Sequence, residues 1–595
     1  MLISRISRSL CLLLCPAIAL AQTANTSTIQ VTSRIVYVDV VVHDGSGHLV
    51  HGLTQKDFQV WEDGKPQQVD YFVAHSYDLA GPHPLPAPPP KNEYSNVPMS
   101  GAGGAVNMIL FDLVNTDPQS QQYARKQMLS FLKALPPGQQ IALFVLSDQL
   151  HMFQSFTGSS DLLAAAAKLI NPTNMRLLQS DAEQQRDIDT LGRMQDALGG
   201  RDAGGSIQHL ADLMMEENEQ TAEIRQRITL SAFAEIAHAA AGYPGRKNLY
   251  WLSGSFPFSV TMQSQYNITG PVQFSTLNNP TLPISDVNAV QDAAKLVANS
   301  QIAVYPISAV GLDTGGVGVD VSGGSMAAMS GTSGQGNNAG LGTGSVKHTM
   351  GDTLAQQFVN RSTLHGAMED IAYQTGGEAV FGSNDLAGAL RRTMEDGSNY
   401  YTLAYRPQNH DWNGAFRKIK VALAQRGYSL TYRRGYFAFA NQTGNENTAQ
   451  ELNAALQPGA PQSTLLLIRS TVTPPDAQNP FVLVDTTVEP AGIEFTTDAA
   501  GVRHAKLLVL LVALTDSVDG KPEVQPDNPP QTSGALHLDF TPEQYASILK
   551  TGIRFGLKLP LKPGSYQMRL GVSDVNNHRL GTLNMPVTIG AVPPS

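Results

Sequence analysis

Short apolar runs alternate with amphipathic stretches between residues 105 and 397, and this alternation is the main pattern of the chain. The predicted strand Val106–Phe111 contains the apolar run Met108–Phe111, and Ile141–Leu146 is a second continuous apolar run, as expected of strands that are buried on both faces. Pro118–Leu135 repeats apolar residues at helical spacing and stops before Pro136. Strands that alternate with helices of this length predict a mainly parallel, doubly wound α/β sheet with helices on both faces.

The remaining elements of this α/β region follow the same two patterns. We expect strands at Leu150–Phe156, Leu249–Leu252, Ile302–Ile307 and Glu378–Phe381, and helices at 160–170, Thr221–Ala241, Asp286–Ser300, Leu364–Thr375 and Asp385–Glu395. Residues 175–220 are polar and are expected to form an insertion. Residues 311–351 are rich in Gly, Ser and Asn without periodicity, which predicts a surface loop.

The regions on either side of the α/β pattern are β in character. Residues 29–75 and 398–440 alternate apolar and polar positions, so each strand has one buried face, and we expect the two segments to pair into one discontinuous β-sandwich. Residues 76–104 are rich in Pro and Gly and are expected to be a linker, as is 441–462 with its short helix. Residues 463–595 contain about seven short strands, which predicts an immunoglobulin-like β-sandwich.

The N-terminal segment has the pattern of a signal peptide. Arg5 and Arg8 precede the apolar run Leu10–Leu20, which is too short to span a bilayer. Small residues at positions 19 and 21 predict cleavage after Ala21. We therefore expect residues 1–21 to be removed and the protein to be exported to the periplasm, the outer surface or the medium.

Composition excludes several classes of site and partner. A chain of 595 residues is too long for one core and should contain several domains. Both cysteines, Cys11 and Cys15, lie in the predicted signal peptide, so the mature chain has no disulfide, thiolate metal site or cysteine nucleophile. Loss of Arg5 and Arg8 takes the net charge from −10 to −12 (−10 − 2), which argues against nucleic acid as a partner. No later run approaches the length of a membrane span.

The polar cluster directly after the strand Val106–Phe111 is the strongest candidate for a functional site. It contains Asp112, Asn115, Thr116 and Asp117. Ligands of open α/β sheets bind at the carboxyl ends of the strands, where such side chains are displayed. The alternative is structural, with Asp112 capping the following loop and helix through hydrogen bonds.

An ordered set of short phrases connects the chain with a known family. They include Leu53-Thr-x-x-Asp-Phe58, Phe111-Asp-x-x-Asn-Thr116, Pro244-Gly-Arg-Lys-Asn248, Val304-Tyr-Pro306, Asp385-Leu-Ala-x-Ala-Leu-Arg391 and Arg434-Gly-Tyr-Phe437. On these phrases, residues 30–438 resemble proteins with a von Willebrand factor type A (VWA) domain, and more narrowly the VWA-related proteins of acidobacteria. The resemblance implies a Rossmann-like VWA domain inserted in the β-sandwich, and it does not extend to the C-terminal sandwich.

The resemblance also implies a metal-ion-dependent adhesion site. VWA domains bind a divalent cation through Asp-x-Ser-x-Ser after the first strand, a Thr in a later loop and an Asp after the fourth strand. Asp112, Thr116 and Thr173 match three of these positions. The middle Ser is replaced by Val114, and the late Asp is replaced by Gly254. The site is therefore degenerate.

The retained residues suggest only weak cation binding. Mg²⁺ prefers six hard oxygen ligands, and Asn115, Ser253 and Ser255 are additional candidates to supply oxygens. One carboxylate among neutral oxygens predicts low Mg²⁺ affinity unless a partner completes the shell. The alternative is that no metal binds.

The sequence favours a non-enzymatic protein. It has no Gly-x-x-x-x-Gly-Lys-Ser/Thr, Gly-x-Ser-x-Gly or His-Glu-x-x-His motif, and its histidines show no ligand spacing. We expect an exported adhesion or protein-interaction module that binds an unidentified protein through the loops after Phe111, Ile170 and Leu252. A structural or assembly protein of the cell envelope, without a metal, is the alternative. A hydrolase with a site not visible in the sequence is a third class.

Overall fold

The computed structural model describes most of the chain. It covers residues 35–76, 90–97, 105–135, 139–171, 206–243, 245–255, 300–310, 366, 368–369, 371–439, 448–476, 478–515 and 529–590. The predicted signal peptide, Thr173 and the tract 311–351 lie outside these residues, as does the predicted helix Asp286–Ser300 except for Ser300.

A five-stranded sheet forms the centre of the α/β region. Its order is β10 (Ile302–Ser308), β9 (Lys247–Ser253), β6 (Val106–Asp112), β7 (Gln140–Leu146) and β8 (Leu150–Thr157). The first four strands are parallel, and β8 is antiparallel to β7. Every residue of β6, β9 and β10 is buried, which explains why the central part of each strand is apolar in the sequence.

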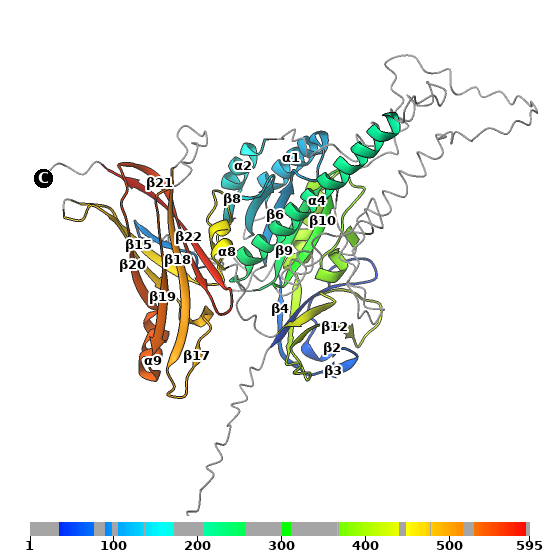
Figure 1. The fold of residues 1–595 in the computed structure, drawn as a ribbon. Helices are drawn as coiled ribbons and strands as arrows, with labels where there is room; N and C mark the ends of the chain where they lie inside the picture. The colour runs from blue at the N-terminus through cyan, green and yellow to red at the C-terminus, as the bar shows by residue number, and fades with distance from the viewer. Residues whose placement is uncertain are drawn as a thin grey trace, which may run out of the picture.

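Helices cover both faces of this sheet (Figure 1). One face carries α1 (Pro118–Lys133), α2 (Ser160–Leu169) and α7 (Leu386–Ser398), which share one hydrophobic core with the sheet. The other face carries α4 (Ser206–Ala240) and the helical residues Met368 and Ile371, which contribute to a second core. The prediction of a mainly parallel sheet with helices on both faces is confirmed.

Two elements differ from the sequence prediction. The long helix begins at Ser206 rather than Thr221, because the preceding residues, though polar, are rich in the helix formers Leu, Met, Glu and Gln. The predicted strand Glu378–Phe381 is only an isolated parallel bridge between Val380 and Ile307. The next bridge toward Glu378 would need an N–H from Pro306, which proline lacks.

Strands from the two flanking β segments pair with each other below the α/β region. One sheet has the order β13 (Ser429–Thr431), β1 (Val36–His43), β11 (Tyr400–Tyr405) and β4 (Val69–His75). The facing sheet has the order β14 (Gly435–Phe439), β12 (Asn413–Leu423), β2 (Phe58–Glu62) and β3 (Lys65–Gln67). Each sheet combines strands from before and after the α/β region, and the two share one core.

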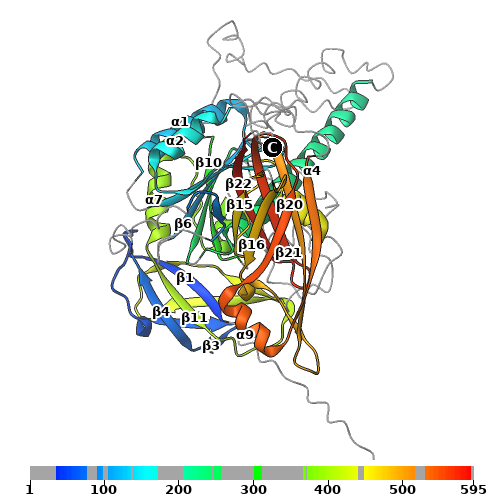
Figure 2. The ribbon, with the colours of Figure 1, turned by 90° about the vertical axis from the view of Figure 1, so that its left-hand side faces the viewer.

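The C-terminal region is a second sandwich, seen beside the α/β region in Figures 1 and 2. Its strands are β15 (Ile468–Thr473), β16 (Val482–Val488), β17 (Thr496–Thr497), β18 (Arg503–Thr515), β19 (Gln531–Phe540), β20 (Ile553–Leu559), β21 (Gly564–Asp574) and β22 (Leu580–Ile589). They form two sheets around one core. A helix that the sequence analysis did not predict, α9 (Pro542–Thr551), begins at a capping box on Thr541. A short helix, α8 (Thr448–Ala455), precedes the sandwich.

The predicted linker 76–104 contains a strand of this second sandwich. β5 (Glu93–Ser95) pairs with β15 and forms the edge of its sheet. Tyr94 packs against the core and donates a hydrogen bond to the carbonyl of Pro586 (2.6 Å). The interpretation of the whole segment as a linker is therefore wrong, because three residues among prolines are too few to show a strand pattern.

Candidate functional site

Asp112 is the last residue of β6 and is fully buried at the carboxyl end of the sheet. Its Oδ1 accepts a hydrogen bond from the backbone N–H of Asn115 (2.9 Å). Its Oδ2 accepts hydrogen bonds from Asn115 Nδ2 (2.8 Å), Trp251 Nε1 (2.9 Å) and Ser253 Oγ (2.9 Å). Four donors therefore surround the carboxyl group, two from the loop after β6 and two from the neighbouring strand β9.

The protonation of Asp112 reflects two opposing effects. Burial raises the pKa of this carboxyl group, while the hydrogen bonds from Asn115, Trp251 and Ser253 lower it and only partly offset the burial. The buried carboxyl group of Asp112 is thus stabilised by hydrogen bonds from uncharged donors. This arrangement stabilises the loop 113–116, whereas the following helix is capped by Asp117, whose side chain accepts from the N–H groups of Gln119 and Ser120.

Asn115 connects the loop to helix α4. Its Nδ2 also donates to Thr229 Oγ1 (2.9 Å), and the Thr229 hydroxyl donates to the carbonyl of Arg225 (2.8 Å). Both contacts of Nδ2 are to acceptors, which determines the orientation of the amide. Its Oδ1 is buried without a hydrogen-bond partner among the described residues. The amide therefore joins Asp112 to the helix on the far side of the loop.

Gly254 occupies the position where the VWA pattern has its late Asp. The N–H of Gly254 donates to Thr116 Oγ1 (2.8 Å). A Cβ at this position would lie 3.0 Å from the Cα of Thr116 and 3.1 Å from the carbonyl oxygen of Asn115. The two loops meet so closely that a carboxylate side chain at Gly254 would require them to move apart.

These residues do not fit Mg²⁺ as they stand. Of the two carboxylates, Asp117 caps helix α1, and Asp112 has both oxygens engaged by N–H and O–H donors. The indole N–H of Trp251 points at Oδ2, where a cation would face a positive dipole. Thr116 Oγ1 is already an acceptor for the backbone of Gly254. In the described part of the chain no group of three His, Cys, Asp or Glu side chains could hold a metal ion.

The structure brings together most of the residues that the sequence singled out. Asp112, Asn115, Thr116 and Ser253 form one hydrogen-bonded cluster. Ser255 takes part through its backbone, since its carbonyl lies 2.6 Å from Ser253 Oγ and shares the single hydroxyl proton of Ser253 with Asp112 Oδ2. Thr173, the third residue that matches the VWA pattern, lies outside the described residues.

Two members of the network were missed in the sequence. Trp251 lies two residues before Ser253 in β9, so the period of a strand places both side chains on one face. That spacing places Trp251 on the same face of the strand as Ser253, but it does not specify that the indole N–H points at Asp112. Thr229 lies in the buried part of α4, and only the docking of the helix brings it to Asn115.

Comparison with known proteins does not assign a family. No protein-family model and no curated protein matches the chain. Among solved structures, an aerotolerance-related membrane protein from Bacteroides fragilis is 14% identical over 49% of this chain and 98% of that chain, with a TM-score of 0.22. The minor pilin PilB of Streptococcus sanguinis is 13% identical over 50% of this chain and 61% of that chain, with a TM-score of 0.21. Proximal thread matrix protein 1 from the mussel byssus is 11% identical over 49% and 47%, with a TM-score of 0.20. TM-scores of this size carry no functional argument.

Proposed function

We propose that this chain is an exported, non-enzymatic protein-interaction module of the VWA type. In this proposal it binds a protein partner through the carboxyl end of the five-stranded sheet and does so without a bound metal. The supporting observation is the closed hydrogen-bond network of Asp112, in which Asn115, Trp251 and Ser253 take the place of a cation. Such a network stabilises the loops of this face in a fixed position, which is what a preorganised binding surface requires.

The surface around the network offers contact residues on three elements. Gln119 is exposed in the first turn of α1, Asp148 in the turn between β7 and β8, and Val310 just after β10. All three follow the carboxyl ends of strands, where open α/β sheets bind their ligands. Export rests on the N-terminal pattern with cleavage after Ala21. No helix in the described ranges is both long and apolar enough to cross a membrane.

The metal-free part of the proposal is tested by calorimetry. The chain from Gln22 onward is titrated with Mn²⁺ and with Mg²⁺, beside the Asp112→Asn variant and the exposed control Asp148→Asn. We expect no saturable heat up to millimolar metal in any of the three proteins, and no shift in the thermal unfolding midpoint. Saturable binding that is lost in Asp112→Asn and kept in Asp148→Asn would contradict the proposal and establish the cation site.

The binding face is tested by site-specific photo-crosslinking in cells that export the protein. A photoreactive amino acid replaces Gln119 or Asp148 at the carboxyl end, or the exposed Lys133 at the opposite end of α1. We expect Gln119 and Asp148 to yield the same discrete adduct and Lys133 to yield none. Adducts from Lys133 alone, or none at any position, would overturn the assignment of this face.

A further inference from the structure

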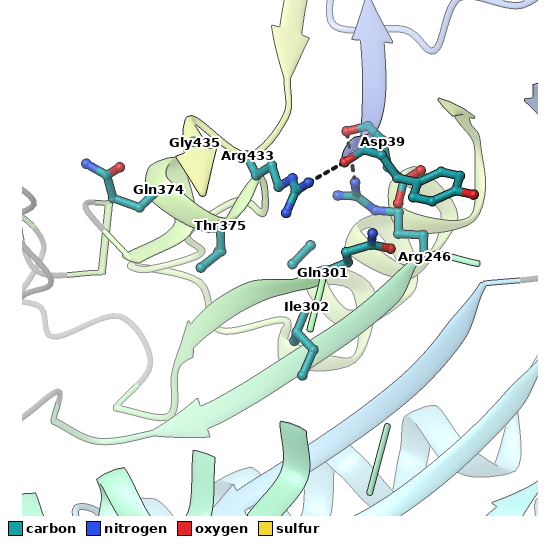
Figure 3. Close-up of a pocket in the computed structure, with 10 residues that line it drawn as sticks. Asp39, Arg246, Gln301, Ile302, Gln374, Thr375, Arg433 and Gly435 are labelled. Atoms are coloured by element: carbon teal, nitrogen blue, oxygen red, sulfur yellow. Dashed lines mark hydrogen bonds between the residues drawn. The ribbon is translucent and has the colours of Figure 1, made fainter. Parts of the chain in front are cut away.

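Open strand edges in this protein are protected to different degrees. β1 pairs with β11 over Val36–Val40 and with β13 only beyond that stretch, so one edge of its first half is open. Arg433 donates to the carbonyl of Tyr37 (2.6 Å), and Arg246 donates to the carbonyl of Asp39 (3.3 Å). Figure 3 shows both guanidinium groups directed at this part of β1. The two arginines thus occupy carbonyl groups that an added strand would otherwise bind.

β19 in the C-terminal sandwich is an edge strand without such protection. It pairs with β18 along its whole length of ten residues, in a register without a bulge. No other strand in the described part of the chain pairs with it. Its sequence contains no proline, lysine or arginine, although proline and charged side chains, lysine above all, commonly protect open edges from pairing with another chain.

One hydrogen bond shows which backbone groups of β19 face away from β18. The N–H of Ala513 donates to the carbonyl of Pro530 (2.8 Å). In an antiparallel pair, residues that bond the neighbouring strand alternate with residues that face away from it, so the even-numbered residues of β19 bond β18. The residues that direct N–H and C=O to the open side are Gln531, Ser533, Ala535, His537 and Asp539. All of them are exposed, and among the described residues these backbone groups have no hydrogen-bond partner.

We infer that β19 pairs with β19 of a second copy of this chain and forms a two-fold symmetric dimer. An antiparallel pairing centred on Ala535 engages every outward residue. Ala535 faces Ala535 of the second copy, and each residue pair exchanges two backbone hydrogen bonds. Ser533 faces His537, and Gln531 faces Asp539, so no like charges lie opposite each other. The two sheets then form one continuous sheet across the dimer.

Gly534 and Leu536 make this register self-complementary on the inner face as well. Leu536 is only partly buried at the margin of the sandwich core. Gly534 is exposed, and a Cβ there would meet no atom within 4 Å. With Ala535 at the centre, Leu536 of each copy lies opposite Gly534 of the other and covers this open space. The dimer therefore buries apolar surface in addition to pairing the backbone groups of the edge.

Sedimentation of the chain from Gln22 onward at increasing concentration tests the dimer. The weight-average mass of the wild type should rise toward twice that of the monomer. Ala535→Pro removes an outward N–H but no bond to β18, so the monomer should keep its circular dichroism and its thermal midpoint in dilute solution. This variant should raise the dissociation constant of the dimer by roughly tenfold or more. Ala535→Thr keeps the N–H and is the matched control, with dimerisation like that of the wild type. A wild type that stays monomeric, or equal dimerisation of the proline variant, would overturn the inference.

A disulfide tests the register, and it remains decisive if Ala535→Pro does not fold. The chain from Gln22 onward contains no cysteine. In the proposed dimer the two Cα atoms of residue 535 are about 5.5 Å apart, within the range of a disulfide. Ala535→Cys should therefore form a covalent dimer under mild oxidation. Gln531→Cys is the control, because its two copies would be about 27 Å apart, eight residues along the strands, and should stay monomeric. Equal cross-linking of both variants, cross-linking of Gln531→Cys alone, or cross-linking of neither would contradict the pairing.

Discussion

At the scale of single residues, Gly254 decides what the strand-end cluster can do. Its N–H bonds Thr116, and the backbones of the two loops lie too close for an added side chain. Asp112 is correspondingly surrounded by donors rather than by other acceptors. The absence of a side chain at position 254 and the closure of the Asp112 network are therefore two parts of one arrangement.

This coupling predicts the result of placing a carboxylate at position 254. Gly254→Asp should lower the free energy of unfolding by about 1–3 kcal/mol, because the new Cβ meets Thr116 at 3.0 Å and Asn115 at 3.1 Å. It should not create Mg²⁺ affinity, since Trp251 continues to donate to Asp112. Urea denaturation measures the free energy of unfolding. Repeating it with about 5 mM Mg²⁺, enough to occupy a weak cation site, shows whether the variant binds the metal.

The matched control for added charge is Gly534→Asp. Gly534 is exposed in β19, and a Cβ there would meet no atom within 4 Å. Its stability should change by no more than about 0.5 kcal/mol. If Gly254→Asp is as stable as this control, or is stabilised by Mg²⁺, the two loops can separate and the coupling does not hold.

Much of this cluster could be predicted from the sequence, and the reason is geometric. Asp112 and Ser253 end adjacent parallel strands, so their side chains meet once the strand order is known. The contact between Asn115 and Thr229 could not be predicted, because it depends on how α4 docks against the sheet. The engagement of Asp112 by Trp251 depends on a rotamer, which a pattern of polar positions does not specify.

At the scale of elements, β5 makes the C-terminal sandwich depend on a segment far away in sequence. Asn96, directly after β5, is 4% exposed. Its Nδ2 donates to the carbonyls of Ser463 (2.9 Å) and Leu466 (2.8 Å), and its Oδ1 accepts from the N–H of Ile468 (2.6 Å). The side-chain amide of Asn96 thus forms hydrogen bonds with three buried backbone groups.

Asn96→Ala should accordingly destabilise the C-terminal sandwich by about 2–4 kcal/mol, since the carbonyl of Leu466 and the N–H of Ile468 lose a buried partner and the carbonyl of Ser463 keeps only the N–H of Thr582. The measurement is urea denaturation, with hydrogen exchange of β15 amides to locate the loss. Asn453→Ala is the control, because Asn453 is exposed in α8 and its side chain bonds the carbonyl of Ala449 in the same helix. Equal stability of the two variants would mean that β5 is dispensable.

The elements differ in how far the sequence revealed them. The central strands of the α/β sheet were predictable because burial on both faces leaves short apolar runs such as Met108–Phe111. β5 was not, because it is three residues long and is stabilised by Asn96 and the pairing with β15 rather than by its own composition. The predicted edge strand Glu378–Phe381 is reduced to one bridge at Val380, because Pro306 has no N–H to form the next hydrogen bond.

At the scale of the whole molecule, helix α4 connects the α/β region to the C-terminal sandwich. Thr464, just before β15, donates its hydroxyl to the carbonyl of Ala239 (3.0 Å) and accepts from the N–H of Gly242 (2.9 Å). A Cβ on Gly242 would lie 2.3 Å from the carbonyl oxygen of Thr464, so the end of the helix touches the sandwich backbone. The sequence marks Gly242 only as a helix stop, and the contact behind it is tertiary.

The same junction buries a carboxylate whose titration should report on it. Burial raises the pKa of Glu235, on α4, to about 7, although the hydroxyl of Ser231 and the charge of Arg569 on β21 lower it. His238, also on α4, does not offset a negative charge, because burial lowers its pKa and keeps it neutral. A raised folded-state pKa means that the ionised carboxylate costs stability, and the cost grows as pH rises from about 4.5, the unfolded value, through about 7.

Glu235→Gln removes this cost and so predicts a pH-dependent difference from the wild type. The variant should gain up to about 3 kcal/mol over the wild type between pH 5 and pH 8.5, as measured by urea denaturation at each pH. Glu223→Gln, an exposed position of the same helix, should show no such gain. A gain that is absent, or that falls as pH rises, would mean that solvent reaches Glu235 and that α4 and the C-terminal sandwich separate in solution. A stability gain in Glu235→Gln and not in Glu223→Gln would instead show that α4 stays packed against the C-terminal sandwich. Ionisation of Glu235 at higher pH would then weaken this packing.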